Sequence, residues 1–517
     1  MQKTISLVIA LMLLSPIVLL PAFAAEDTEE LERQSYLQPD IATANIIEIG
    51  KSTIFDASQS FIPDPEINVR YEWEFGDGNK NEGIEVLHAY KEPGWYTATL
   101  KLHYGEEIAE AKIDIFVYQK MVVMITDQEE YKDRISIFKN IAQNKGVHLE
   151  VVESFGSSTE FISEEILTKK LNEGFRSLQL ANEIIIWTKE NAGLNALSRF
   201  IQNPQRRADT DFSQKIILLV ETNIRAKISR TERQFSVIEP KMIIIAKESA
   251  IDDLLESADK EEMITKLEER GRNYETIDSK SGKIRPWNFM SYFVNVLIQN
   301  GIPDNTIALL LLLPVIATVV AFMRQVIGVT TFGIYTPSIM TLSFLVIGLY
   351  AGLLTLAIAI VIGLLSKPLL RQVRMLFIPK MAIVVTLVSL SLLLLLIASI
   401  YLNLFDTQFL SIAIFPMLIL STLVEKFVSS KGEKSFSSAT AIMLETVLVA
   451  IVAFFVAGGE INLGVVAFKM EFVKDLMLNH PEMVFFLILV NILLGKWSGL
   501  RVLERVRFRE VLRHIEE

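Results

Sequence analysis

The sequence carries a series of apolar runs between Thr306 and Leu500, each long enough for a helix to cross a lipid bilayer. One crossing needs about 20 apolar residues, so few other folds could bury these runs. We count seven runs, which predicts an all-α seven-helix transmembrane bundle over residues 306–500. The predicted spans are residues 306–323, 330–347, 348–366, 381–404, 408–423, 439–456 and 483–500.

The basic residues between the runs fall almost wholly in alternate connections. Cytoplasmic connections are enriched in lysine and arginine, so this asymmetry orients the bundle. The connections assigned to the inside contain Arg324, Lys367, Arg371, Arg374, Lys380, Lys426, Lys431, Lys434, Arg501, Arg505, Arg507, Arg509 and Arg513, whereas those assigned to the outside contain only Lys469 and Lys474. The pattern predicts a multi-pass protein of the inner (plasma) membrane, with an extracytoplasmic N-terminal part and a basic cytoplasmic tail, residues 501–517.

Residues 1–24 are predicted to be a secretory signal peptide. Lys3 precedes an apolar stretch, and Ala22-Phe23-Ala24 has the small-residue pattern of a cleavage site. An uncleaved anchor is the alternative. The chain has no cysteine, which excludes disulfides, thiol catalysis and cysteine-bound metals, and we predict no cofactor or metal site. The net charge of −11 arises outside the basic inner segments and argues against nucleic acid as a partner.

Residues 41–118 follow a polar leader, residues 25–40, and alternate in the manner of half-buried strands, which predicts a small antiparallel β-sandwich. The sequences FDAS, YEWEFGDG and HAYKEPGWY, at residues 55–58, 71–78 and 88–96, resemble the PKD (polycystic-kidney-disease-type) domain. That resemblance implies an extracellular Ig-like spacer or adhesive module. We expect His88 to make a structural hydrogen bond rather than bind a metal. The residues expected to support this domain are Trp73, Gly76, Asp77, Gly78 and Tyr96.

Residues 119–285 change to apolar strand-like runs that alternate with amphipathic helical segments. Continuous runs of Ile, Val and Leu joined by helices are typical of a parallel sheet covered on both faces. We therefore predict a Rossmann-like α/β domain of about five strands. The runs are residues 121–125, 147–152, 183–187, 215–220 and 242–245.

A binding crevice in such a domain would lie at the carboxyl ends of its strands. The first strand is not followed by G-x-G-x-x-G, and no Walker-type loop is present. Residues 127–130 offer carboxylates there instead, which would repel phosphate. A purely structural or protein-docking domain is the alternative to a binding crevice. The strand-end residues are Thr126, Ser154, Thr188 and Glu221.

Residues 286–305 precede the bundle with an aromatic-rich helical period, which predicts an interfacial helix and linker. In the second span, Gly333, Tyr335 and Pro337 fall within the apolar run. This helix is therefore broken or re-entrant, with freed backbone groups near Tyr335 and Pro337 that can bind a ligand. The alternatives are a proline kink and a shallow interfacial start.

Two ionisable residues lie inside predicted spans at similar depth, Glu445 in the sixth and Lys496 in the seventh. A charged group at membrane depth is costly, so both are candidates for function. We hypothesise that they pair across the bundle. The alternatives are a purely structural pair, and a Lys496 side chain that reaches the cytoplasmic headgroups.

Six short segments of the bundle together resemble one bacterial family: RQVIG at residues 324–328, TFGIYTP at 331–337, PK at 379–380, FPM at 415–417, PE at 481–482 and RVRFRE at 505–510. It is the seven-helix membrane module usually fused to an inactive transglutaminase-like domain. The resemblance implies no established activity. It also implies genomic neighbours, because members tend to be encoded beside ATP-grasp peptide ligases and retropepsin-like proteases. The transglutaminase-like part is absent here.

These observations predict a non-enzymatic membrane scaffold or receptor-like protein. Its ectodomain would bind an extracytoplasmic protein, peptide or glycan, and its basic inner face would dock a cytoplasmic partner such as an ATP-grasp ligase or a protease. The alternative is a transporter with a solute path near Glu445, Tyr335 and Pro337. The spans contain no H-E-x-x-H, no paired aspartates and no Ser/His dyad, which argues against an intramembrane enzyme.

Overall fold

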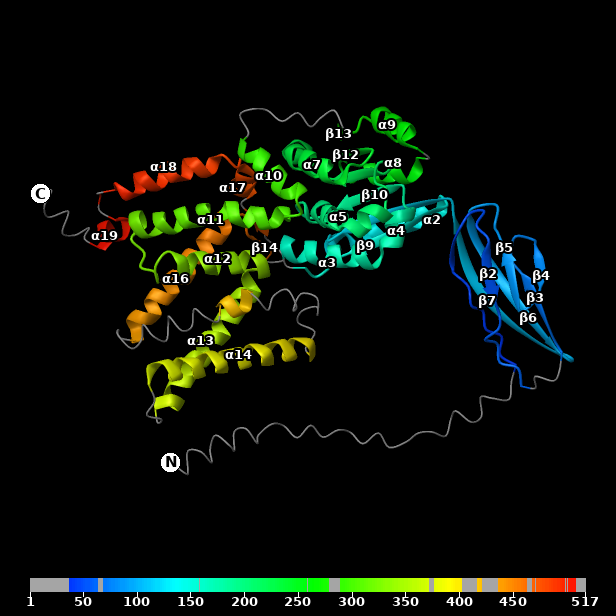
Figure 1. Ribbon diagram of the computed structural model, residues 1–517, viewed down its shortest axis with the longest axis horizontal. Coiled ribbons are helices and arrows are strands. Elements are labelled where there is room, and N and C mark those ends of the chain that lie inside the picture. Colours follow the sequence, from blue (N-terminus) through cyan, green and yellow to red (C-terminus); the bar gives the residue numbers. More distant parts are fainter. Residues whose placement is uncertain are drawn as a thin grey trace, which may run out of the picture. The chain divides into compact units, whose positions relative to one another are not determined.

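The computed structural model describes residues 37–63, 68–157, 159–257, 259–278, 289–371, 376–401, 416–420, 436–462, 467–469, 471–497, 499 and 501–507 (Figure 1). The chain forms two compact units, Met1–Tyr118 and Gln119–Glu517. The predicted signal peptide, most of the polar leader and the end of the tail lie outside the described residues.

The first unit is a β-sandwich. Its larger sheet has the strand order β1-β7-β6-β3-β4, and β2 pairs with β5 in the smaller sheet. Every pair is antiparallel except β1 with β7. The strands are β1 (Ile46–Glu48), β2 (Thr53–Asp56), β3 (Val69–Glu74), β4 (Lys80–Glu82), β5 (Glu85–His88), β6 (Gly94–Tyr104) and β7 (Glu107–Tyr118).

Trp73 is the centre of the sandwich core. Its side chain is fully buried and packs against Phe55 and Phe75. Its indole N–H donates a hydrogen bond to the carbonyl oxygen of Gly83 at 3.0 Å, so burial leaves no polar atom of the ring unpaired. The hydroxyl of Tyr96 donates to a backbone carbonyl four residues earlier in the chain, at 3.1 Å.

The turn between β3 and β4 depends on its glycines. Gly76 and Gly78 have φ angles of +80° and +90°, and a Cβ on Gly76 would lie 2.8 Å from the carbonyl oxygen of Thr97. The carboxylate of Asp77 lies 2.8 Å from Nε2 of His88, within hydrogen-bond distance. His88 therefore ties this turn to β5.

The sandwich begins earlier than the sequence indicated. Leu37 is buried in its core, and Gln38 forms a β-bridge with Phe61. Both residues belong to the stretch that we assigned to a polar leader. The few apolar residues of this polar stretch show no regular spacing, so pattern analysis could not place Leu37 in the core.

The second unit begins with an α/β domain built on a six-stranded sheet of order β9-β8-β10-β11-β12-β13. The first five of these strands are parallel, and β13 is antiparallel at the edge. The five apolar runs of the sequence correspond to the parallel strands, whereas β13 is too short and polar to stand out. The strands are β8 (Lys120–Thr126), β9 (Val147–Glu153), β10 (Glu183–Trp187), β11 (Ile216–Val220), β12 (Met242–Ala246) and β13 (Tyr274–Ile277).

Helices cover both faces of this sheet, which explains why its strands are apolar throughout. Helices α2 (Lys132–Asn144), α8 (Ala250–Glu256) and α9 (Lys260–Glu269) pack on one face. On the other face, α5 packs so closely on the sheet that a Cβ added to Gly193 would clash with the side chain of Ile186. Helix α7 packs beside α5. The remaining helices of the domain are η2 (Glu129–Tyr131), α3 (Glu160–Glu173), α4 (Phe175–Leu180), α5 (Ala192–Gln202), α6 (Pro204–Asp209) and α7 (Ile224–Ile238).

The rest of the second unit is mainly helical. Among the described residues, three segments are long and apolar enough to cross a membrane: Asp304–Ile327, Leu349–Ser366 and Ser438–Val456. The elements are α10 (Phe289–Gln299), α11 (Asp304–Phe322), the π-helix η3 (Met323–Ile327), α12 (Tyr335–Ile347), α13 (Leu349–Arg371), α14 (Phe377–Tyr401), α16 (Phe436–Val456), β14 (Glu460–Asn462), β15 (Ala467–Lys469), α17 (Glu471–Asn479), α18 (Met483–Gly495) and α19 (Val502–Arg507).

The described helices differ from seven full spans. Helices α12 and α18 have 13 residues each, too few to cross a bilayer at a rise of about 1.5 Å per residue. The apolar run of the second span includes residues 330–334, which are not helical. Hydropathy alone cannot separate helical from non-helical apolar residues. The fifth predicted span lies largely outside the described residues.

The α/β domain rests on one end of the membrane helices. The hydroxyl of Thr159 donates to the carbonyl oxygen of Val346 at 2.6 Å, which joins the start of α3 to the end of α12. The guanidinium of Arg233 donates to the carbonyl oxygen of Leu478 at 2.8 Å, which joins α7 to α17. The α/β domain and the membrane helices therefore share a polar interface.

Helix α10 has two different faces. Val294 and Ile298 are buried against α7 and α11, whereas Phe289, Tyr292 and Phe293 are exposed. An exposed aromatic face is what an interfacial helix presents to lipid headgroups.

Candidate functional site

A cavity of about 380 Å³ lies between the α/β domain and the ends of the membrane helices. One wall is polar and is formed by the loops after β8, β9 and β10 and by α17. The other wall is apolar and is formed by α11, α12, α13 and α16. The polar wall includes Asp127, Ser157, Thr159, Glu160, Lys189, Glu190 and Lys474, and the apolar wall includes Ala308, Leu312, Leu345, Ile347, Leu349, Ala351, Phe454 and Ala457.

The strand order explains why the polar wall is here. Strand β8 has β9 on one side and β10 on the other, so the connections that leave these carboxyl ends diverge. In open parallel sheets a crevice forms at such a reversal of strand order. Asp127 follows β8, Glu160 is the first residue of α3, and Lys189 and Glu190 follow β10.

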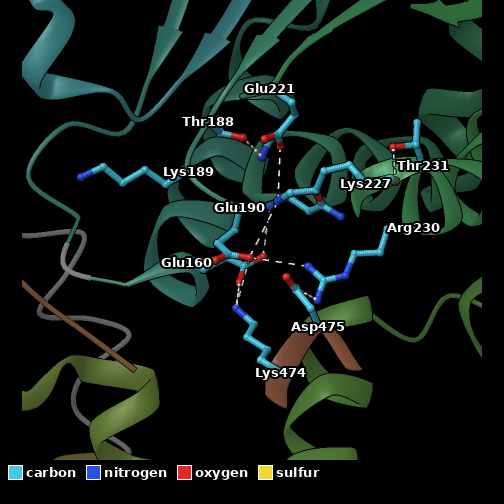
Figure 2. A network of polar contacts seen from close by, with 12 residues as sticks. Glu160, Thr188, Lys189, Glu190, Glu221, Lys227, Arg230, Thr231, Lys474 and Asp475 are labelled. Atoms are coloured by element: carbon cyan, nitrogen blue, oxygen red, sulfur yellow. Dashed lines mark hydrogen bonds and ion pairs between the residues drawn. The ribbon is translucent and has the colours of Figure 1, made fainter. Parts of the chain in front are cut away.

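A buried ion-pair network forms one side of the cavity, and Figure 2 shows Glu160 and Glu190 side by side within it. Nζ of Lys474 lies 2.7 Å from the carboxylate of Glu160 and 3.6 Å from that of Glu190. Lys227 and Arg230 approach the Glu190 carboxylate at 3.9 and 3.5 Å. None of these five side chains is more than 12% exposed. Because Lys474 belongs to α17, the network ties α17 to the α/β domain.

A second ion pair reinforces this connection. The guanidinium of Arg230 lies 3.0 Å from the carboxylate of Asp475 on α17. Burial alone would lower the pKa of Lys474, but the carboxylates of Glu160 and Glu190 outweigh it and raise that pKa. The ammonium group therefore stays charged at neutral pH.

Glu190 has a left-handed backbone, with φ at +56°, which residues other than glycine rarely adopt. Such strain persists only where neighbouring contacts hold the residue, and here three cationic side chains surround its carboxylate. The conformation lets both Lys189 and Glu190 line the cavity.

Asp127 is held in place by hydrogen bonds from two elements. Its carboxylate accepts from the backbone N–H of Lys189 at 2.7 Å and from the hydroxyl of Ser163 at 3.1 Å. Burial raises the pKa of Asp127 to about 6, and these hydrogen bonds offset only part of that effect. Asp127 is thus mostly ionised at neutral pH and protonated in mild acid.

Glu164 lies behind the polar wall and contacts both parts of the second unit. Its carboxylate accepts from the side chain of Asn305 on α11 and lies 3.1 Å from Arg199. Burial raises the pKa of Glu164 to about 8, and Arg199, which also binds the half-exposed Glu165 at 2.7 Å, offsets only part of that effect.

Replacing Glu164 by glutamine is expected to stabilise the protein at mildly alkaline pH. The carboxyl of Glu164 titrates near 4.5 when unperturbed and near 8 when folded, so the folded chain binds the extra proton in this window. The free energy of unfolding therefore falls as pH rises through the window, and Glu164→Gln removes this loss. Thermal unfolding of the purified protein across the window measures the difference.

The matched control is Glu165→Gln, which changes a half-exposed neighbour. Its pH dependence should follow the wild type. If Glu164→Gln also follows the wild type across the window, the carboxyl of Glu164 does not carry the extra proton.

The strand-end residues that the sequence indicated lie beside the cavity rather than on its wall. The hydroxyl of Thr126 accepts from the backbone N–H of Gln128, and that of Thr188 accepts from the backbone N–H of Gly193 in α5. The hydroxyl of Ser154 lies 2.8 Å from that of Ser163, and Glu221 binds Lys227 at 3.3 Å. These residues shape the loops that carry the lining residues.

Sequence reasoning did not single out Glu160, Lys189, Glu190 or Lys474. The charged pair at positions 189 and 190, directly after a buried strand, is a signal that could have marked this loop. Lys474 and Glu160 are 314 residues apart, and no local pattern links them.

The predicted pairing of Glu445 with Lys496 is wrong. The carboxylate of Glu445 accepts hydrogen bonds from the backbone N–H of Thr330, at 2.6 Å, and from its hydroxyl. Lys496 is exposed at the end of α18. The physical reason is that residues 330–334 are not helical, so their N–H groups need an acceptor in the apolar region.

Tyr335 and Pro337 lie in the first turn of α12. Tyr335 is 79% exposed, and Pro337 is buried. Proline is well tolerated in a first turn, where its missing N–H would have no helical partner. The irregular stretch therefore precedes α12, where the N–H of Phe332 donates to the hydroxyl of Thr446 at 3.2 Å.

Two families match the chain. Residues 38–117 match the PKD domain. Residues 261–512 match the family described as 7 transmembrane helices usually fused to an inactive transglutaminase. Each match covers less than half of the chain. The membrane-spanning helices make the chain an integral membrane protein, and the match to the seven-helix family begins inside α9 of the α/β domain.

Two solved structures are similar to small parts of the chain. One is from a study of carbohydrate-binding modules of the beta-sandwich super family, with 20% identity and a TM-score of 0.16 over 19% of this chain and 40% of the other. The second is the PKD domain of the human VPS10 domain-containing receptor SorCS2, with 19% identity and a TM-score of 0.14 over 17% of this chain and 80% of the other.

Proposed function

We propose that the chain is a non-enzymatic, receptor-like protein of the inner membrane. Its PKD and Rossmann-like α/β domains face the extracytoplasmic side and bind a protein, peptide or glycan, and its basic inner face docks a cytoplasmic partner. The observation that carries the proposal is the cavity that the α/β domain shares with the membrane helices. A ligand there touches both parts at once, so its binding can alter the helices directly.

The arrangement of the helix ends supports this orientation. The α/β domain contacts the end of α12 and helix α17, and the positive-inside pattern assigned both regions to the outside. Two of the segments assigned to the inside lie close to each other. Gly328 directly follows η3, the helix that contains Arg324. A Cβ added to Gly328 would lie 3.0 Å from the side chain of Arg501.

The inner partner that we propose is an ATP-grasp ligase or a protease. Crosslinking the tagged full-length protein in cells, followed by mild-detergent purification and mass spectrometry, tests it. Recovery of such a partner from wild type, but not from the Arg324→Gln, Arg501→Gln double variant, is the expected result. The exposed Lys247→Gln serves as control. Recovery of only self-crosslinked protein contradicts the receptor role.

A transporter is the second candidate, and Glu445 is the observation that favours it. Carboxylates inside membrane bundles mark ion and substrate paths in many proteins, and Glu445 lies beside non-helical backbone. Under this alternative, Glu445→Gln would abolish solute flux in proteoliposomes while the protein stays folded. Under the receptor proposal, the same variant would leave partner recovery intact.

A further inference from the structure

The walls of the cavity differ in chemistry, and this difference defines its ligand. We infer that the cavity binds an amphiphile with one apolar chain and a head group that donates hydrogen bonds and carries no negative charge. The inference rests on the receptor role proposed above and names the class of its ligand. Both an amine and a sugar head have this chemistry.

The apolar wall provides the site for the chain. Side chains from three separate membrane helices, Ala308 on α11, Ala351 on α13 and Phe454 on α16, line it. All three are at most 5% exposed. Hydrocarbon surfaces of this kind offer water no hydrogen-bond partner, whereas burial against them stabilises a bound alkyl chain.

The polar wall provides acceptors for the head group. Among the described residues that line the cavity, Asp127, Glu160, Glu190 and Glu460 carry carboxylates, and Lys189 and Lys474 carry ammonium groups. Both ammonium groups already have carboxylate neighbours. Lys474 binds Glu160 and Glu190, and Lys189 lies 3.6 Å from Glu130.

This charge balance selects against anions. A phosphate or carboxylate head would approach four carboxylates, and both lysines that line the described part of the cavity are already shared with carboxylates. A hydroxyl or ammonium group would instead donate to carboxylates that are fixed by the protein. Asp127 is the clearest of these acceptors, because backbone and hydroxyl donors hold its carboxylate at the cavity wall.

The test is photolabelling of the full-length protein in phosphatidylcholine nanodiscs. Three probes share one dodecyl chain with a photoreactive group, and their heads are an amine, a glucoside and a phosphate. We expect the amine, the glucoside or both to label cavity residues of α11, α13 and α16 about tenfold more than the phosphate, as one charge-assisted hydrogen bond allows. Comparing the amine with the glucoside tells the two head groups apart.

Variants place the labelling in the cavity. Ala308→Phe and Ala351→Phe fill the apolar wall from two helices, and each should abolish the label. Ala441→Phe, at an exposed position of α16, should preserve it. Asp127→Asn keeps the shape of the side chain and should remove the preference for the amine, whereas the exposed Asp133→Asn should not.

Two results would overturn the inference. The first is labelling by the phosphate at least as strong as by the other heads. The second is labelling that survives both cavity-filling variants. After either result, the crosslinking experiment on the wild-type protein in cells decides the receptor role. If that experiment recovers the inner partner, only the ligand class is wrong and the receptor role stands. If partner recovery is lost as well, the receptor role fails on its own test.

Discussion

Replacing Lys474 by methionine is expected to destabilise the second unit by about 3–5 kcal/mol, because it removes one partner of a buried charge network. Glu160 would lose its ion pair at 2.7 Å and keep its carboxylate in a buried position. Glu190 would retain Lys227 and Arg230. The purified protein should melt several degrees lower, and protease should reach α3 and α17 sooner.

Two further variants test whether the lost stability comes from the ion-pair network or from the removal of any lysine. Lys247→Met removes an exposed lysine of the same domain and should melt with the wild type. Adding Glu160→Gln to Lys474→Met removes the orphaned charge and should recover much of the loss. A Lys474→Met protein that melts with the wild type would show that the network contributes nothing to the stability of this interface.

Replacing Trp73 by alanine is expected to unfold the PKD domain or to destabilise it by about 3–5 kcal/mol, the usual cost of emptying a large aromatic site. The ring is fully buried, and its loss also leaves the carbonyl of Gly83 without its donor. Limited proteolysis of the full-length protein should release fragments from residues 38–117 while the membrane part stays intact.

The sandwich itself offers a matched control. Trp95 is 58% exposed on β6, so Trp95→Ala removes a ring of the same size with little loss of burial. It should leave the proteolysis pattern unchanged. Equal sensitivity of the two variants would mean that Trp73 is not the centre of the core.

The sequence predicted those parts of the fold that local pattern determines. Buried parallel strands such as Ile216–Val220 are apolar throughout, and the turn at Gly76 carries its own glycine signature. Apolar runs also marked the membrane part, but not where each helix begins. Residues 330–334 are apolar enough to count as helix, yet their backbone pairs with Glu445 and Thr446.

The candidate site was harder to predict because its residues meet only in three dimensions. Strand-end chemistry pointed to the edge of the sheet where Asp127 and the cavity lie. The cavity also needs Lys474, from a connection that hydropathy treats as a loop, and Ala308, which is one apolar residue among many. The charge of Glu445 marked it as a candidate, and we paired it with a lysine. Its carboxylate instead accepts from the backbone N–H of Thr330, which has no helical partner because this stretch is not helical.

The hydrogen bond from Arg233 to α17 bears on how this protein can be divided. A fragment that ends before the membrane helices would leave Arg230 without Asp475 and Glu160 without Lys474. It would also expose Val237 and the apolar rim that α10 and α11 cover. The α/β domain therefore depends on its contacts with the membrane part and is not an independent domain. The isolated fragment would be prone to aggregate, because it exposes apolar surface and unpaired charges. Antibodies or binders raised against it would recognise surfaces that are buried in the intact protein.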